Sequence, residues 1–172
     1  MIDISKLNNR YDIRRLGDAD TDQILSLYRE NTQFYRYCEE KPTREQVYSD
    51  MHNTPPDIGL PDKYFIGFFQ KDTLVAVMDL IDGYPEPDIA FIGLFMMNRK
   101  FQGQQLGTAI ILETESYLKT AGKTAIRLCI NKGNPQATHF WKKNGFIVIK
   151  ETDRNGWPIL IAEKKISGNK NL

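Results

Sequence analysis

The nine residues IAFIGLFMM, from Ile89 to Met97, constrain the fold more than any other stretch of this sequence. They are apolar at nearly every position, whereas a strand with one solvated face alternates apolar and polar residues. An uninterrupted apolar strand is typical of the middle of a sheet. The run therefore predicts a central strand.

The segments around this run predict a mixed α/β domain. We expect further strands at 11–17, 63–70, 73–82, 125–131, 146–151 and 157–166, and helices at 18–31, 42–53, 103–119 and 135–145. The dipeptide Asn155-Gly156 predicts a hairpin between the last two strands. No linker, repeat or composition shift divides the chain, so a single domain over residues 1–172 is expected.

The composition limits the kinds of binding partner that we expect. The 23 basic and 22 acidic residues leave a net charge of +1, which gives no reason to expect a nucleic-acid or membrane surface. The two cysteines, Cys38 and Cys129, lie far apart, so we expect free thiols and no disulfide framework or cysteine metal site. The N-terminal residues do not resemble a signal peptide, and a cytoplasmic location is expected.

The stretch RKFQGQQLGTAI, from Arg99 to Ile110, joins the central strand to the longest predicted helix. The first N–H groups of a helix have no partner within it and suit an anion such as a phosphate. Gly103 and Gly107 would let a bulky anion approach the backbone. Alternatively, Gly103 only enters the helix and Gly107 only allows close packing. The two standard glycine-rich phosphate motifs do not fit this stretch.

This junction and the downstream NPQATHFWKKNGF resemble the GNAT superfamily of acyl-CoA-dependent N-acetyltransferases. The family signature Q/R-x-x-G-x-G/A falls on Gln102 to Gly107, with Gln105 where the family usually has glycine. In the second motif Trp141 occupies the usual tyrosine position. The positions of that motif that fit are Asn134, Ala137, Phe140, Lys143, Gly145 and Phe146.

The resemblance implies a single-domain fold whose mixed, mostly antiparallel central sheet splays between the fourth and fifth strands and carries about four helices. It also implies acetyl-CoA as the acyl donor, with no metal. The N–H groups of residues 103–108 would hold the pyrophosphate, and the strand backbone would follow the pantetheine arm. The implied cofactor-binding residues are Phe95, Met97, Gln102, Gly103, Gln104, Gln105, Gly107, Thr108 and Asn134.

The reaction implied is transfer of an acetyl group to a primary amine, which must lose a proton to attack. Relatives often carry a glutamate base at a position matching Gly93 or Leu94. Neither residue can act as a base, and Asp79, a carboxylate inside an apolar run, is the candidate instead. Trp141 has no acidic proton. If the leaving thiolate is protonated, Tyr84 or Tyr35 would do it, while Trp141 orients the sulfur, lines the pocket or only packs.

The acceptor would bind near the first two helices, where Phe34 and Tyr35 could line a pocket or complete the core. Its identity stays open between a small molecule and a peptide. His139 and His52 are expected to pack or face solvent. Two other hypotheses remain: a catalytically weak CoA-binding regulatory domain, and a domain whose glycine turn is purely structural. A homodimer through the last strand is possible.

Overall fold

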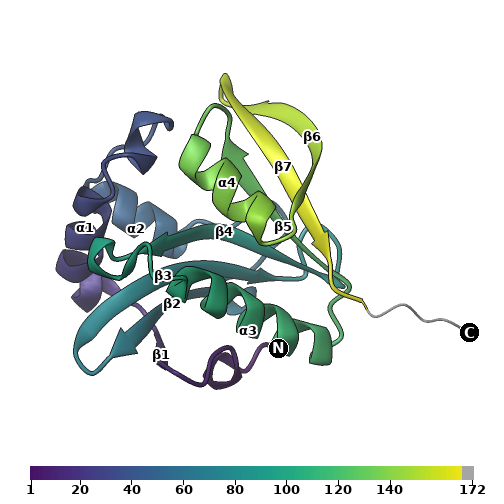
Figure 1. Ribbon diagram of the computed structural model, residues 1–172, viewed down its shortest axis with the longest axis horizontal. Helices are drawn as coiled ribbons and strands as arrows, with labels where there is room; N and C mark the ends of the chain where they lie inside the picture. The colour runs from purple at the N-terminus through teal and green to yellow at the C-terminus, as the bar shows by residue number, and fades with distance from the viewer. Residues whose placement is uncertain (168–172) are drawn as a thin grey trace, which may run out of the picture.

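The computed structural model describes residues 1–167, which form a seven-stranded sheet with helices on both faces (Figure 1). The sheet order is β1-β2-β3-β4-β5-β7-β6. The strands are β1 (Asp12–Arg15), β2 (Lys63–Gln70), β3 (Thr73–Asp82), β4 (Ile89–Met97), β5 (Ala125–Asn131), β6 (Ile147–Arg154) and β7 (Trp157–Lys165). The helices are α1 (Thr21–Glu30), α2 (Arg44–His52), α3 (Leu106–Thr120) and α4 (Pro135–Lys143). Among the described residues, no helix is long and apolar enough to cross a membrane.

The sheet is antiparallel except between β4 and β5, which run parallel and pair over only four residues. The last pair is Ile92 with Leu128. Beyond it, β4 stays paired with β3 as far as Met97, and β5 stays paired with β7 as far as Asn131. The two strands converge at one end and diverge at the other (Figure 1). The expected splay between the fourth and fifth strands is confirmed.

A β-bulge lies where this splay begins. Asp79 of β3 pairs with Leu94, and the next residue, Leu80, pairs with Ile92, so Gly93 is the extra residue of β4. A bulge bends its strand and disrupts the ladder locally. It therefore helps turn β4 away from β5.

Two apolar clusters cover the two faces of the sheet. One contains buried side chains of α3 and α4, among them Ile110, Leu118 and Trp141. The other contains buried side chains of α1 and α2, among them Tyr28 and Val47. β4 is central as predicted, yet its second half is only partly buried, whereas β3 is buried over nearly its whole length. The reason is that the edge of β4 that faces β5 has no neighbouring strand beyond Ile92.

Most elements are shorter by a few residues than expected, α1 for example beginning at Thr21 and not at Asp18, and the clearest differences are at α3 and β6. α3 begins at Leu106 and not at Gly103, because residues 103–105 form a turn before the helix. β6 continues to Arg154, beyond the predicted end at residue 151, and the hairpin closes through Asn155 and Gly156 alone. Both turn residues have positive φ, 52° and 84°, as the predicted turn type requires.

Candidate functional site

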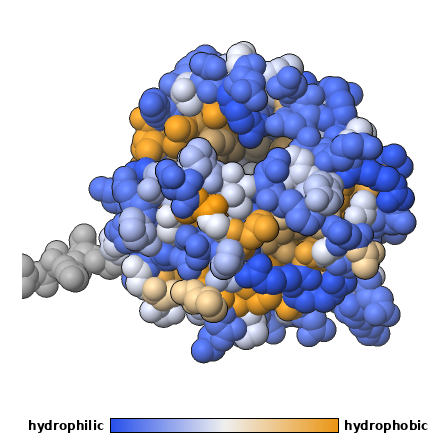
Figure 2. Space-filling model, turned by 180° about the vertical axis from the view of Figure 1, so that it is seen from behind, coloured by the Kyte–Doolittle hydropathy of each residue, from blue (hydrophilic) through white to orange (hydrophobic). Residues whose placement is uncertain are grey.

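A cavity of about 410 Å³ occupies the splay between β4 and β5. The second half of β4, the start of α3, the end of β5 and one face of α4 line it, together with Asn31, Phe34 and Arg154. Seen from the side opposite to Figure 1, the largely hydrophilic surface has a recess with hydrophobic residues at its edge (Figure 2). The residues that the sequence singles out around the two motifs thus surround one space.

The start of α3 presents free hydrogen-bond donors to this cavity. Within the described residues, none of the N–H groups from Gly103 to Thr108 donates to a backbone or side-chain acceptor. Gly103 and Gln105 both adopt positive φ, 73° and 60°. Gln105 therefore takes the left-handed conformation for which glycine is the usual residue, and it keeps the turn that the family signature would need.

The neighbouring glutamine side chains hold the turn in place. The Gln102 amide donates to Asn31 Oδ1 at 2.8 Å and to the Met97 carbonyl at 3.1 Å. Gln104 does not line the cavity, and its amide donates to the Lys100 carbonyl at 3.0 Å. Both side chains are already hydrogen-bonded, so an anion at this turn would meet the backbone.

Gly107 and Asn134 have structural tasks next to the cavity. A Cβ at Gly107 would lie 3.3 Å from Phe140 and 3.4 Å from Met97, which confirms close helix–sheet packing at this glycine. Asn134 is 2% exposed and caps α4, its Oδ1 accepting the Ala137 N–H at 3.0 Å. Both residues also line the cavity, so packing and ligand contact are compatible at these positions.

Three packed aromatic rings, Phe95, Phe140 and Trp141, form part of the apolar wall, and Phe146 packs behind Trp141. Phe95 stacks on Phe140, and Trp141 makes edge contacts with Phe95, Phe140 and Phe146. Trp141 is 7% exposed and belongs to the core cluster, while it also reaches the cavity. Trp141 therefore packs in the core, and it would contact a ligand only as part of the cavity wall.

Asp79 lies directly behind the bulge, 8% exposed, and does not itself line the cavity. A Cβ at Gly93 would lie 2.5 Å from Asp79 Oδ2, so the missing side chain of Gly93 leaves room for this carboxylate. Oδ2 accepts a hydrogen bond from Lys63 Nζ at 2.7 Å, and Oδ1 has no partner among the described residues. Burial raises the pKa of Asp79 to about 6, although the Lys63 ammonium acts in the opposite direction.

A second buried carboxylate belongs to the same polar cluster. Asp50 accepts the Tyr28 hydroxyl at 2.8 Å and the Gln46 amide at 2.7 Å. Burial raises the pKa of Asp50, and its charge in turn raises that of Asp79. A proton on Asp79 is thus favoured by burial and by Asp50 and opposed by Lys63, which leaves the Asp79 carboxyl able to exchange a proton near neutrality.

Of the residues predicted to bind the acceptor or to donate a proton, Phe34 lines the cavity, and Tyr35 and Tyr84 do not. Phe34 lines the cavity, whereas Tyr35 packs beneath it against Phe34 and Tyr28, and burial raises the pKa of Tyr35 far above its ordinary value. Tyr84 lies in the turn before β4, where its ring packs on Phe91 and does not line the cavity. The structure does not bring Tyr84 to the site.

Several lining residues lay outside the sequence-based prediction. Asn31 comes from the end of α1, Cys129 from β5 and Arg154 from the end of β6. His139, expected to pack or face solvent, is exposed and forms part of the cavity wall. Gln136, His139 and Lys143 recur at a spacing of three to four residues on α4, a helical spacing that could have identified this face from the sequence. No local pattern marks Arg154.

The comparisons with known proteins agree with this geometry. The model of the acetyltransferase (GNAT) family matches residues 23–146. No curated protein matches the sequence significantly. Among solved structures, an acetyltransferase from Thermus thermophilus superposes with a TM-score of 0.72 at 21% identity, over 91% of this chain and 97% of that one. The PaiA N-acetyltransferase from Thermoplasma acidophilum in complex with coenzyme A gives 0.65 at 24% identity, over 90% and 98%.

A spermidine N-acetyltransferase SpeG chimera from Vibrio cholerae and hSSAT gives a TM-score of 0.66 at 18% identity, over 92% of this chain and 96% of that chain. At these identities the solved structures establish the shared fold.

Proposed function

Because this chain belongs to the GNAT acetyltransferase family, we propose that it transfers an acetyl group from acetyl-CoA to a primary amine. One observation carries the proposal: the N–H groups from Gly103 to Thr108 have no acceptor among the described residues, and all of these residues except Gln104 line the cavity in the splayed sheet. The positive end of α3 lies at the same place, so this turn favours a pyrophosphate.

The residues around the cavity fit acetyl-CoA. The turn has the small residue and the free donors that a bulky anion needs, and the aromatic wall of Phe95 and Phe140 offers apolar surface for the pantetheine arm. The Met97 carbonyl is already bonded to Asn31 and Gln102, so the backbone of Phe95 is the better partner for that arm. Gln102 influences cofactor binding indirectly, because its side chain holds the turn in place.

Asp79 is our candidate for the group that deprotonates the amine. Its carboxylate is held by Lys63 behind Gly93, at the point where relatives with a glutamate on β4 would place their base. A pKa of about 6 leaves it ionised at pH 7 and able to accept a proton. Lys63 is 3% exposed and acts through Asp79, so we regard it as a positioning residue.

The bound donor supplies a thioester, whose C–S bond breaks as the acceptor nitrogen forms its bond to the acetyl carbon. One proton of the acceptor ammonium goes to Asp79, and the second leaves the nitrogen and ends on the thiolate sulfur. A thiol with an ordinary pKa of about 8.5 leaves adequately without a dedicated acid. The chain therefore needs no tyrosine at position 141, and Trp141 serves as part of the wall.

A catalytically weak CoA-binding domain is the second candidate. It is favoured by the burial of Asp79, whose paired oxygen is tied to Lys63. Against it, the other oxygen has no partner among residues 1–167, and the fold is shared with the spermidine N-acetyltransferase chimera.

The first test is thermal unfolding with and without acetyl-CoA. At about 100 times its dissociation constant, a ligand stabilises the fold by roughly 2.7 kcal/mol. We expect Thr108→Asp to lose this shift, because the added carboxylate occupies the anion position. The same change suits the first turn of a helix, so the unliganded protein should remain folded.

Thr108→Asn is the matched control, since it has nearly the same shape without the charge. It should keep the shift. If Thr108→Asp still responds to acetyl-CoA like the wild type, the pyrophosphate does not bind at the start of α3. Release of free thiol with a panel of amines then separates turnover from binding alone.

A further inference from the structure

The side chains at the acceptor end of the cavity indicate which amine the enzyme accepts. We propose that the acceptor is an α-amino acid, whose carboxylate binds Arg154 and whose amino group points to the cavity wall at Gly93, in front of Asp79. This inference rests on the proposed function, and its test below measures binding separately from turnover.

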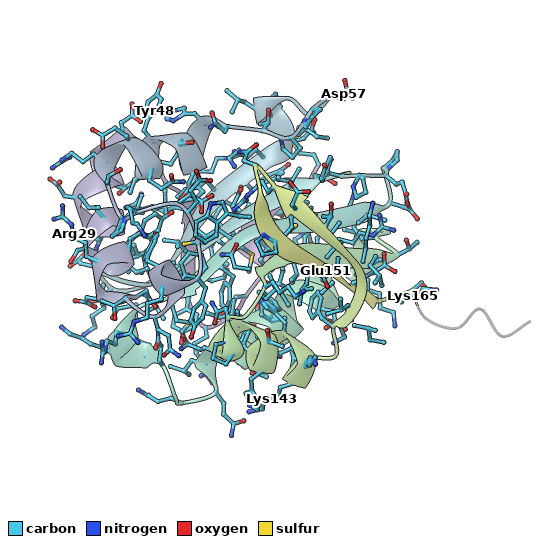
Figure 3. All side chains as sticks on the ribbon, turned by 90° about the horizontal axis from the view of Figure 1, so that it is seen from above. Arg29, Tyr48, Asp57, Lys143, Glu151 and Lys165 are labelled. Atoms are coloured by element: carbon cyan, nitrogen blue, oxygen red, sulfur yellow. The ribbon has the colours of Figure 1, made fainter. Side chains whose placement is uncertain are left out.

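Arg154 reaches the cavity from the end of β6. Its Nη2 donates to Glu40 Oε1 at 2.8 Å, so the hairpin of β6 and β7 is tied to the connection between α1 and α2. In the view from above, this hairpin, marked by Glu151, lies in front of the other strands of the sheet (Figure 3). The guanidinium has five donors and only one contact to Glu40, which leaves donors for a bidentate carboxylate.

The charges on the cavity wall disfavour an acceptor with several amino groups, such as a polyamine. Among the described lining residues the charged side chains are Lys143 and Arg154, and no aspartate or glutamate lines the cavity. Lys143 lies near the start of α3, since the next residue, Asn144, approaches Thr108. Arg154 is therefore the charged side chain at the end of the cavity where the acceptor would bind. A polyamine would bring two or more positive charges to a wall without a lining carboxylate, whereas an α-amino acid brings one, together with a carboxylate for Arg154.

The two anchors flank the same point of the sheet. Gly93 on β4 and Cys129 on β5 are the first residues beyond the last pair, Ile92 with Leu128. Both residues line the cavity, as does Arg154, and the Asp79 carboxylate fills the space beside Gly93. Burial raises the pKa of the Cys129 thiol, and the positive charge of Arg154 opposes this effect, so Arg154 lies on the β5 side of the opening. An acceptor between β4 and β5 can therefore meet Arg154 on one side and Gly93 on the other.

The remaining lining fixes the size and polarity of the acceptor. Phe34 and Leu94 are half-buried apolar side chains on the wall of the same space. A cavity of about 410 Å³ that also holds a pantetheine arm leaves room for a small molecule only. The side chain of the amino acid should therefore be apolar.

The test uses L-leucine, L-methionine and L-phenylalanine, each beside its carboxamide and beside a diamine. With CoA bound to prevent turnover, thermal unfolding reports binding of each probe. We expect the amino acids to raise the unfolding midpoint, and the carboxamides to bind roughly 10- to 100-fold more weakly, as expected for loss of a hydrogen-bonded ionic contact. With acetyl-CoA, the same order should appear in KM.

Two variants separate recognition from tethering. Arg154→Gln removes the charge and weakens the contact with Glu40, whereas Glu40→Gln weakens the same contact but keeps Arg154 charged. If Arg154 binds the carboxylate, only Arg154→Gln should lose amino-acid binding. If Arg154 is only a tether, both variants will weaken binding equally, and the inference is overturned.

The other outcomes are equally decisive. Tighter binding of carboxamides or diamines than of amino acids would overturn the inference. Failure of every probe to bind would do the same. Amino-acid binding that depends on Arg154, without release of thiol from acetyl-CoA, would support this acceptor site and refute the proposed turnover.

Discussion

Gly93→Ala tests the bulge and the buried ion pair together. The new Cβ would lie 2.5 Å from Asp79 Oδ2 and 3.2 Å from its Cγ, closer than real Cβ contacts allow. The carboxylate must move, and it is held at 2.7 Å by Lys63, which is 3% exposed. The substitution therefore breaks a buried contact, although alanine creates no backbone strain here because φ of Gly93 is not positive.

The magnitude follows from these contacts. A buried ion pair that loses one partner costs about 3–5 kcal/mol. Alanine returns about 0.4–1 kcal/mol by restricting the unfolded chain. The net loss should be about 2–4 kcal/mol, which lowers the unfolding midpoint by roughly 10 °C in a chain of this length. Because Asp79 is displaced, acetyl transfer should fall as well.

Gly17→Ala is the matched control, because a Cβ there meets nothing within 4 Å. Its stability should stay within about 0.5 kcal/mol of the wild type. Denaturant unfolding of both variants, and of each in an Asp79→Ala background, measures the coupling. In that background Gly93→Ala should cost almost nothing. Equal stability of Gly93→Ala and Gly17→Ala in the otherwise wild-type protein would refute the reasoning.

Two further predictions concern the turn and the carboxylate. Gln105→Gly should raise the free energy of unfolding by about 1 kcal/mol, because a left-handed conformation costs a residue with a Cβ roughly that amount. Acetyl-CoA should still bind to this variant. A lower free energy of unfolding would contradict the prediction. Folding raises the pKa of Asp79 from 3.8 to about 6, so its contribution to stability is present below pH 4 and disappears as pH rises through 6. The stability of the wild type relative to Asp79→Asn should thus fall by about 2 kcal/mol between pH 4 and 7, while kcat/KM of the wild type rises over the same range. Urea unfolding measures the stability, and initial rates measure kcat/KM. The same pH dependence of stability in the wild type and in Asp79→Asn would exclude the shift.

The sequence alone determined the elements and the end of the cavity that we propose for the cofactor. Apolar periodicity is a local property, so the order of strands and helices could be predicted, including the central strand from Ile89 to Met97. The turn at 102–107 was recognisable for the same reason, since its residues are contiguous. Even Gln105, which departs from the family signature, adopts the conformation that the signature requires.

The acceptor end was decided by the tertiary structure. Asp79 stood out as a carboxylate in an apolar run, but its partner Lys63 and its contact with Gly93 depend on the register of three strands. Arg154 meets Glu40 across 114 positions of sequence. Such contacts depend on where the pairing of β4 and β5 stops and on a bulge at one glycine. No local pattern contains that information, because strand pairing joins residues that are distant in the chain.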